Sequence, residues 1–264
     1  MPSNVRITSR QHPLVRQFRL AAERADREPT ALLDGEHLLR EALAARVPIR
    51  AVLTDGGHPE LTDRAAESGA AVHTCTRAVL EAASPVRTPS GIVALAAWTP
   101  ARLEDVFRAR PALVVGLVDV QDPGNVGSTI RSADALGATG LIALGATADP
   151  ASWKVLRGSM GSAFRLPVAR GSLAEAVGRA RREGVRVLAT AVAGGDPLPT
   201  ADLAAPALVL FGHEGLGLPT AALAEADASI TIPMRAGIDS LNVAVAAALV
   251  LDEARRQRAR ARSR

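Results

Sequence analysis

The 264-residue sequence has a single cysteine, no tyrosine and only 2% aromatic residues. The lone cysteine, Cys75, excludes an internal disulfide and any metal site built from several cysteines. The core must therefore be packed mainly with leucine, valine, isoleucine and alanine. Because 48% of the residues are hydrophobic, the chain can bury a sizeable core, and disorder is not expected over most of it.

Long apolar segments are also missing. No uninterrupted apolar run approaches the length of a membrane-spanning helix. The N-terminus, Met1-Pro2-Ser3-Asn4, lacks the apolar core of a signal peptide. The five histidines suggest neither a metal site nor a catalytic triad. These absences predict a cytoplasmic protein without a membrane partner or a metal.

Lys154 is the only lysine, so arginine carries nearly all of the positive charge. The net charge is +4, but residues 1–22 carry +4 and residues 254–264 carry +6, which leaves the rest of the chain at −6. Basic ends on a mildly acidic body predict contact with a polyanion, most simply RNA or DNA. Solvated, frayed ends are the alternative for the C-terminal arm.

Two domains and a linker are predicted. Strand-like and helical segments alternate over residues 1–98, which indicates a small α/β domain. Residues 99–111 contain two prolines and several charges, and they are interpreted as the linker. The second domain, 112–264, has apolar runs typical of a parallel sheet covered on both faces. Those runs are 112–118, 140–144, 166–168, 186–192, 207–211 and 229–233, and a final helix is expected over 240–258.

Three glycine-containing loops follow β-like runs in the second domain. They read D-P-G-N-V-G-S-T-I-R at 122–131, F-G-H-E-G-L-G-L-P at 211–219 and I-P-M-R-A-G-I-D-S-L-N-V at 232–243. Loops at the ends of parallel strands converge on one cleft, which is the usual ligand site of such a sheet. There is no G-x-S-x-G elbow and no lysine-containing phosphate loop.

The polar residues of these loops are the candidates for chemistry. Asn125 is expected to cap the helix after the first loop, and Arg131 to stabilise negative charge near that helix N-terminus. A surface ion pair between Arg131 and Asp134 is the alternative. In the second loop, the Glu214 carboxylate is suited to bonding a hydroxyl or orienting Arg131, and a solvated turn acid is the alternative. The spacing G-x-x-G-x-G there disfavours a nicotinamide-dependent oxidoreductase.

The third loop leads into the most apolar helix of the chain. Asp239 or Ser240 is expected to cap it, with Asn242 in its first turn. Residues 243–251 are almost entirely alanine, valine and leucine. A helix that is apolar all round must be buried, either in the fold or against another subunit.

In order, these motifs resemble those of the SpoU (TrmH-type) branch of the SPOUT RNA methyltransferases. The resemblance covers residues 112–258 and includes R-G-S-M-G at 157–161 as a further stretch. Residues 1–98 are similar to the ribosomal-protein-like substrate-binding domain that often precedes the methyltransferase domain in this family.

The resemblance implies a deep trefoil knot, a homodimer, and S-adenosylmethionine-dependent methylation of a ribose 2′-hydroxyl in RNA. Ribosomal RNA is favoured because of the additional domain. A tRNA substrate and a non-catalytic RNA-binding protein are the alternatives.

The resemblance also assigns roles to residues. It implies that Arg131 is the catalytic residue and acts as a general base. Because arginine is effectively always protonated in proteins, stabilisation of the forming alkoxide is the alternative. The residues implied to orient Arg131, the ribose and the cofactor are Asn125, Glu214, Ser240 and Asn242. Those implied to bind the cofactor are Thr190, Ala191, Gly194, Gly212, Gly217, Ile232, Met234 and Leu241.

Overall fold

The computed structural model describes residues 6–24, 30–213, 215–235, 237–238 and 240–262. The chain folds into two compact units, one of residues 1–99 and 151–164, the other of residues 100–150 and 165–264. The segment 151–164, expected in the second domain, thus belongs to the first unit. It contains helix α7 (Trp153–Ser159), and Trp153 packs against the apolar core of that unit. The Phe164 ring meets Trp98 edge to face, with the centroids 5.8 Å apart.

The first unit is built on a four-stranded mixed sheet. Its order is β1 (Ala31–Asp34), β4 (Ile92–Ala96), β2 (Ile49–Thr54) and β3 (Ala71–Thr74). Strands β2 and β3 are parallel, whereas β4 is antiparallel to both of its neighbours.

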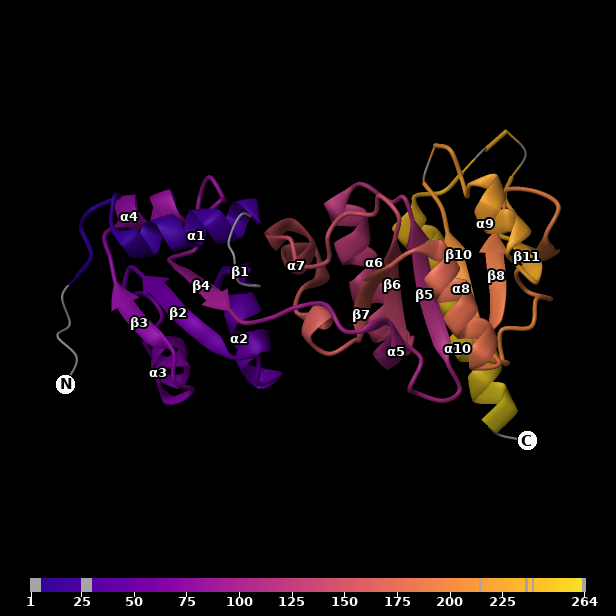
Figure 1. Ribbon diagram of the computed structural model, residues 1–264, viewed down its shortest axis with the longest axis horizontal. Helices are drawn as coiled ribbons and strands as arrows, with labels where there is room; N and C mark the ends of the chain where they lie inside the picture. The colour runs from indigo at the N-terminus through magenta and orange to yellow at the C-terminus, as the bar shows by residue number, and fades with distance from the viewer. Residues whose placement is uncertain (1–5, 25–29, 214, 236, 239, 263–264) are drawn as a thin grey trace. The chain divides into compact units, whose positions relative to one another are not determined.

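Helices cover both faces of this sheet (Figure 1). Helices α1 (Pro13–Glu23) and α4 (Arg77–Ala83) share one apolar cluster with the strands. Helices α2 (Glu36–Ala44) and α3 (Pro59–Glu67) pack against the other face. Cys75 lies in the α1–α4 cluster, and burial raises the pKa of its thiol to about 11. The thiol is therefore protonated and unreactive at neutral pH.

The second unit contains a seven-stranded sheet in which every neighbouring pair is parallel. The order is β7 (Val168–Gly171), β6 (Gly140–Leu144), β5 (Leu113–Val118), β10 (Ala207–Phe211), β8 (Arg186–Thr190), β11 (Ala228–Thr231) and β9 (Asp196–Pro197). The prediction of an α/β fold with a parallel sheet is confirmed. Strand β9 was not predicted, because two residues are too few to show a pattern.

Helices lie on both faces of the parallel sheet. Helix α8 (Leu173–Arg182) packs in front of it in Figure 1, and α10 (Val243–Arg262) lies behind it. Helix α6 (Pro123–Ala135) packs against α10, and α9 (Thr220–Ala224) follows the second predicted loop. Because both faces are covered, the central strands are buried along their whole length, as in Leu113–Val118.

The segment predicted as a linker is folded into the second unit from residue 100 onward. Residues 99–111 contain the short helix α5 (Leu103–Val106), and Ala101 pairs with Ala169 beside the sheet. Val106 and Phe107 are 0% and 1% exposed. These two apolar side chains anchor the segment in the core, which the prolines and charges around them concealed.

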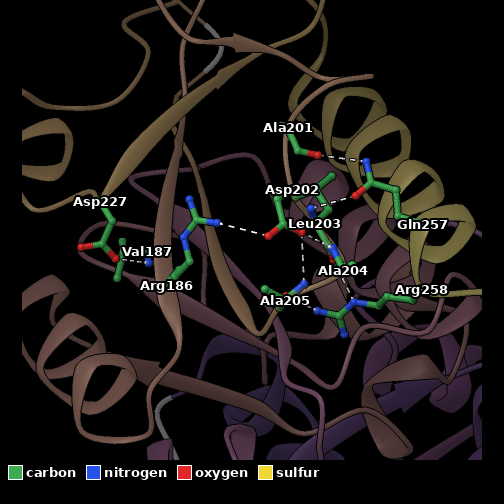
Figure 2. A network of polar contacts seen from close by, with 10 residues as sticks. All are labelled: Arg186, Val187, Ala201, Asp202, Leu203, Ala204, Ala205, Asp227, Gln257 and Arg258. Atoms are coloured by element: carbon green, nitrogen blue, oxygen red, sulfur yellow. Dashed lines mark hydrogen bonds and ion pairs between the residues drawn. The ribbon is translucent and has the colours of Figure 1, made fainter. Parts of the chain in front are cut away.

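The C-terminal end of α10 is held by a network of polar contacts (Figure 2). Four hydrogen bonds of 2.8–3.0 Å run from the half-buried Arg258 guanidinium to backbone carbonyls, which belong to Pro111, Ala112, Leu203 and Ala205. The neighbouring Gln257 accepts from the backbone of Leu203 and donates to that of Ala201. Arg258 thereby joins the C-terminal helix to the segments that precede β5 and β10.

This network changes the interpretation of the basic C-terminal arm. Arg255 and Arg256 form ion pairs with Asp252 and Glu253, the acids just before the arm. Arg258 is occupied by backbone carbonyls, so three of the arm's arginines have partners within the protein. No helix in the described part of the chain is long and apolar enough to cross a membrane.

Candidate functional site

The loops that follow β8, β10 and β11 enclose a cavity of about 330 Å³. Its walls come from residues 190–192, from the loop after β10, and from the segment between β11 and the first turns of α10. Eight residues predicted for the site line it. They are Thr190, Ala191, Gly212, Gly217, Ile232, Met234, Ser240 and Leu241.

Other predicted residues lie elsewhere. Gly194, Asn125, Arg131 and Asn242 are not among the described residues that line the cavity. Glu214 and Asp239 lie outside the described residues. Four apolar lining residues were not singled out from the sequence, although they lie within or just before the predicted loops: Phe211, Leu218, Ile230 and Val243. Phe211 and Ile230 belong to β-like runs, and Leu218 and Val243 to the predicted loops, and that position was the available signal.

The loop after β10 folds back on itself as a tight hairpin. The backbone N–H of His213 donates to the carbonyl of Gly217 at 3.1 Å, and the N–H of Gly217 donates to that of His213 at 2.8 Å. A Cβ atom on Gly212 would overlap the backbone of Gly217 and Leu218. Gly217 has a φ of +68°, a left-handed conformation that favours glycine. The glycines therefore bring backbone groups, without side chains, to the wall of the cavity.

The part of the wall at the end of β8 is fixed by bonds between neighbouring strands. Thr190 donates its hydroxyl to the carbonyl of Leu210 at 2.9 Å, and the backbone N–H of Ala191 donates to Ile230 at 2.9 Å. These contacts hold the end of β8 between β10 and β11. The cavity thus lies at the carboxyl ends of three adjacent parallel strands, where α/β sheets bind ligands.

Two asparagines join the first and third loops. The side-chain amide of Asn242 donates to the side-chain oxygen of Asn125 at 2.9 Å. The same Asn242 accepts from the backbone N–H groups of Ala244 and Val245 at 3.0 and 3.3 Å, so it caps α10. The N-termini of α6 and α10 are therefore fixed together, immediately after the cavity residue Leu241.

Both predicted helix caps are wrong. Helix α6 is capped by Asp122, whose carboxylate accepts from the Asn125 N–H at 2.8 Å. Pro123 is the first residue of the helix, a position where a backbone N–H has no partner within the helix, so its lack of an N–H is not destabilising. The N-cap is therefore Asp122, the residue before it. Asn242 caps α10 because it directly precedes the first helical residue, so Ser240 is left to line the cavity.

Arg131 lies on α6, whose first turn contains Asn125. Its side chain is exposed, and no residue in the described ranges accepts a hydrogen bond from it. The alternative ion pair with Asp134 is not formed, because Asp134 is bonded to Arg165 at 2.9 and 3.1 Å. The Arg131 guanidinium therefore has no structural partner among the described residues.

Comparison with known proteins establishes the family. Residues 112–252 match the model of the SpoU rRNA Methylase family. The chain belongs to the SpoU rRNA methylase family. The match spans β5 to α10 and contains all three loops, so the predicted family and the predicted class of enzyme are confirmed.

Relatives of this SpoU protein extend over both units. It is 33% identical over 222 residues to the 23S rRNA (guanosine(2553)-2′-O)-methyltransferase RlmP of Bacillus subtilis, covering 84% of this chain and 87% of that one. An AdoMet-bound rRNA methyltransferase from Sinorhizobium meliloti is similar in structure, with a TM-score of 0.86, 32% identity and coverage of 96% and 97%. The SpoU methyltransferase AviRb from Streptomyces viridochromogenes in complex with AdoMet gives a TM-score of 0.82, 31% identity and coverage of 94% and 99%.

Proposed function

We propose that this protein transfers a methyl group from S-adenosylmethionine to a ribose 2′-hydroxyl of ribosomal RNA. The observation that carries the proposal is the cavity after β8, β10 and β11, tied by the Asn242–Asn125 bond to the helix that bears Arg131. The methyltransferases to which the chain is similar support the reaction and the cofactor, because RlmP methylates a 2′-oxygen of 23S rRNA by its name and two solved structures have AdoMet bound.

The cavity residues fit S-adenosylmethionine. A volume of about 330 Å³ falls within the range of about 300–1,000 Å³ that is usual for ligand pockets. Apolar side chains such as Ala191, Ile232 and Leu241 would contact the adenine ring. Ser240 and the backbone exposed by Gly212 and Gly217 would bond the polar groups. When bound, the cofactor supplies an electrophilic methyl group on a sulfonium.

Arg131 would act on the sugar. The new bond joins the 2′-oxygen to the methyl carbon, the carbon–sulfur bond breaks, and the hydroxyl proton leaves to an RNA phosphate or water. The guanidinium would stabilise the negative charge that develops on the oxygen and grip the adjacent phosphate. Asn125 and Asn242 would position α6, and Ser240 the reacting groups, so that the oxygen is held in line with the methyl group. Glu214 would orient the ribose or Arg131.

Ribosomal RNA is the substrate that the relatives favour over tRNA. RlmP, by its name, acts on 23S rRNA, and it matches both units of this chain. A ribosomal RNA substrate would place the protein in the cytoplasm. The first unit would then be the RNA substrate-binding domain.

The substrate is testable in cells. Ribose 2′-O-methylation is mapped in total RNA from cells with and without this gene, and from cells complemented with the wild-type gene. We expect one position in ribosomal RNA to lose its methyl group and to regain it on complementation. Loss of a tRNA methyl group instead would favour the tRNA alternative, and an unchanged map would contradict the proposal.

We also propose that the chain forms a trefoil knot around the cofactor cavity. Strand β11 lies beside β8, whereas α10 packs against α6. The segment between β11 and α10 therefore has to return past the loops that follow β8 and β10. All three segments line the same cavity, which supports their crossing there.

A homodimer through α10 is a further part of the proposal. Val245 and Leu249, one turn apart on this helix, are 49% and 44% exposed. Apolar side chains at this spacing form a stripe that a second subunit can cover. One crystal structure tests both proposals, because it would trace the chain through 232–242 and identify any two-fold contact along α10. An unthreaded chain, or a monomer both in the crystal and in light scattering, would contradict them.

A further inference from the structure

Four exposed arginines gather at the start of the first unit. Arg6, Arg10, Arg16 and Arg19 precede or lie on α1, and no carboxylate among the described residues pairs with any of them. The nearby Arg77 of α4 differs, because Glu81 accepts from it at 3.1 Å. The four guanidinium charges are therefore not neutralised within the described protein.

Three of the four are held by the same kind of contact. In each, the Nε–H group donates to a backbone carbonyl of α4 or of the residues just before it. The contacts are Arg6 to Cys75 at 3.2 Å, Arg10 to Ala78 at 3.2 Å and Arg19 to Ala82 at 2.8 Å. Because these carbonyls succeed one another along the chain, the guanidinium groups form a row beside α4.

This contact leaves each guanidinium ready to bind an anion. An arginine has five N–H donors, and Nε uses only one of them. The terminal nitrogens of Arg6, Arg10 and Arg19 have no acceptor among the described residues. They can donate two parallel hydrogen bonds to one phosphate. Because the Nε contact already restricts the side chain, less conformational entropy is lost on binding.

We propose that this arginine row, Arg6, Arg10, Arg16 and Arg19, binds the phosphate backbone of the substrate RNA. The inference rests on the proposed function, because it takes its ligand from there. An anionic lipid surface fits less well. A membrane-binding helix needs exposed apolar side chains, whereas the large apolar residues Val15 and Phe18 of α1 are buried in the core.

The test uses the full-length double variant R10Q/R19Q. A matched control, R46Q/R64Q, removes two exposed arginines at the end of α2 and on α3, which cover the other face of the sheet. Affinity for transcribed 23S rRNA is measured by filter binding at several salt concentrations. We expect R10Q/R19Q to bind at least about tenfold more weakly. The negative slope of its log K against log salt should be shallower by about 1.5. The control should stay close to the wild type.

Arg16 provides a second, structurally neutral variant. It makes no hydrogen bond with any described residue, so R16Q should not affect folding. We expect about threefold weaker RNA binding, and a negative slope of log K against log salt that is shallower by about 0.7–0.9. If R10Q/R19Q unfolds, R16Q alone tests the proposal.

Three results would overturn the inference: unchanged RNA affinity in R16Q and R10Q/R19Q, an equal loss in R46Q/R64Q, or binding through the row to anionic phospholipid vesicles instead of RNA. Methyl transfer by the wild type is measured in parallel. Active wild type with unaffected row variants disproves the row alone. Row-dependent RNA binding without any methyl transfer disproves the proposed function alone.

Discussion

Replacing Arg131 by alanine is expected to lower methyl transfer by roughly 10²–10³-fold, while fold and cofactor affinity stay unchanged. The loss follows from removing a charge that stabilises the forming alkoxide and grips the RNA phosphate. Stability should not change, because the side chain is exposed and makes no hydrogen bond to the described part of the protein. The cavity should not change either, since Arg131 is not among its lining residues.

This result is measured as single-turnover methyl transfer to 23S rRNA, with S-adenosylmethionine affinity from calorimetry and the melting temperature as controls. Arg181→Ala is the matched variant, because it removes another exposed arginine of the same unit, one that pairs with Glu225 at 2.9 Å. It should retain its activity. Arg131→Lys keeps the charge but loses the planar fork, so we expect intermediate rates. Near-normal turnover of Arg131→Ala would refute the assignment.

Replacing Arg258 by methionine is expected to lower the free energy of unfolding by about 2–4 kcal/mol. Its guanidinium donates to four carbonyls of the segments before β5 and β10, and it is half-buried. Burial lowers the pKa of Arg258 from its ordinary value, as expected for a charge withdrawn from water. Methionine retains the aliphatic volume but removes the guanidinium donor from all four carbonyls, of which that of Ala112 keeps the Ala207 N–H at 3.0 Å.

Urea unfolding of Arg258→Met measures this effect. The matched control is Arg255→Met on the same helix, where the arginine is exposed and pairs with Asp252 at 2.7 Å. Exposed pairs contribute less than about 1 kcal/mol, so the control should change little. Equal losses in the two variants would show that the four Arg258 bonds do not stabilise the C-terminal helix.

The strands of the second unit were predictable because their pattern is local. Leu113–Val118 and Ala207–Phe211 are continuous apolar runs, which is typical of parallel strands buried on both faces. Glycines that follow such runs indicate the loops. The carboxyl ends of parallel strands lie at the same edge of the sheet. The convergence of the second and third loops on one cavity follows from this geometry.

The helix ends and the domain boundary were less predictable. Asn125 and Asn242 are 117 residues apart, and their hydrogen bond depends on how α6 packs against α10. The segment 151–164 is helical as expected, but its apolar face packs into the first unit rather than the second. Neither result can be read from periodicity, which indicates that a face is buried but not what covers it.

Local patterns determined the α/β class and the three loops, because strand periodicity and glycine spacing depend only on residues close together in the chain. The resemblance to the SpoU family identified the candidate arginine on α6. The tertiary structure decided which side chains have partners. In the folded protein Arg258 donates to backbone carbonyls and Asp134 pairs with Arg165. Arg131 and the arginine row are exposed to solvent. A charge is available for a ligand only where no group of the protein already binds it, and that depends on contacts between residues distant in the chain.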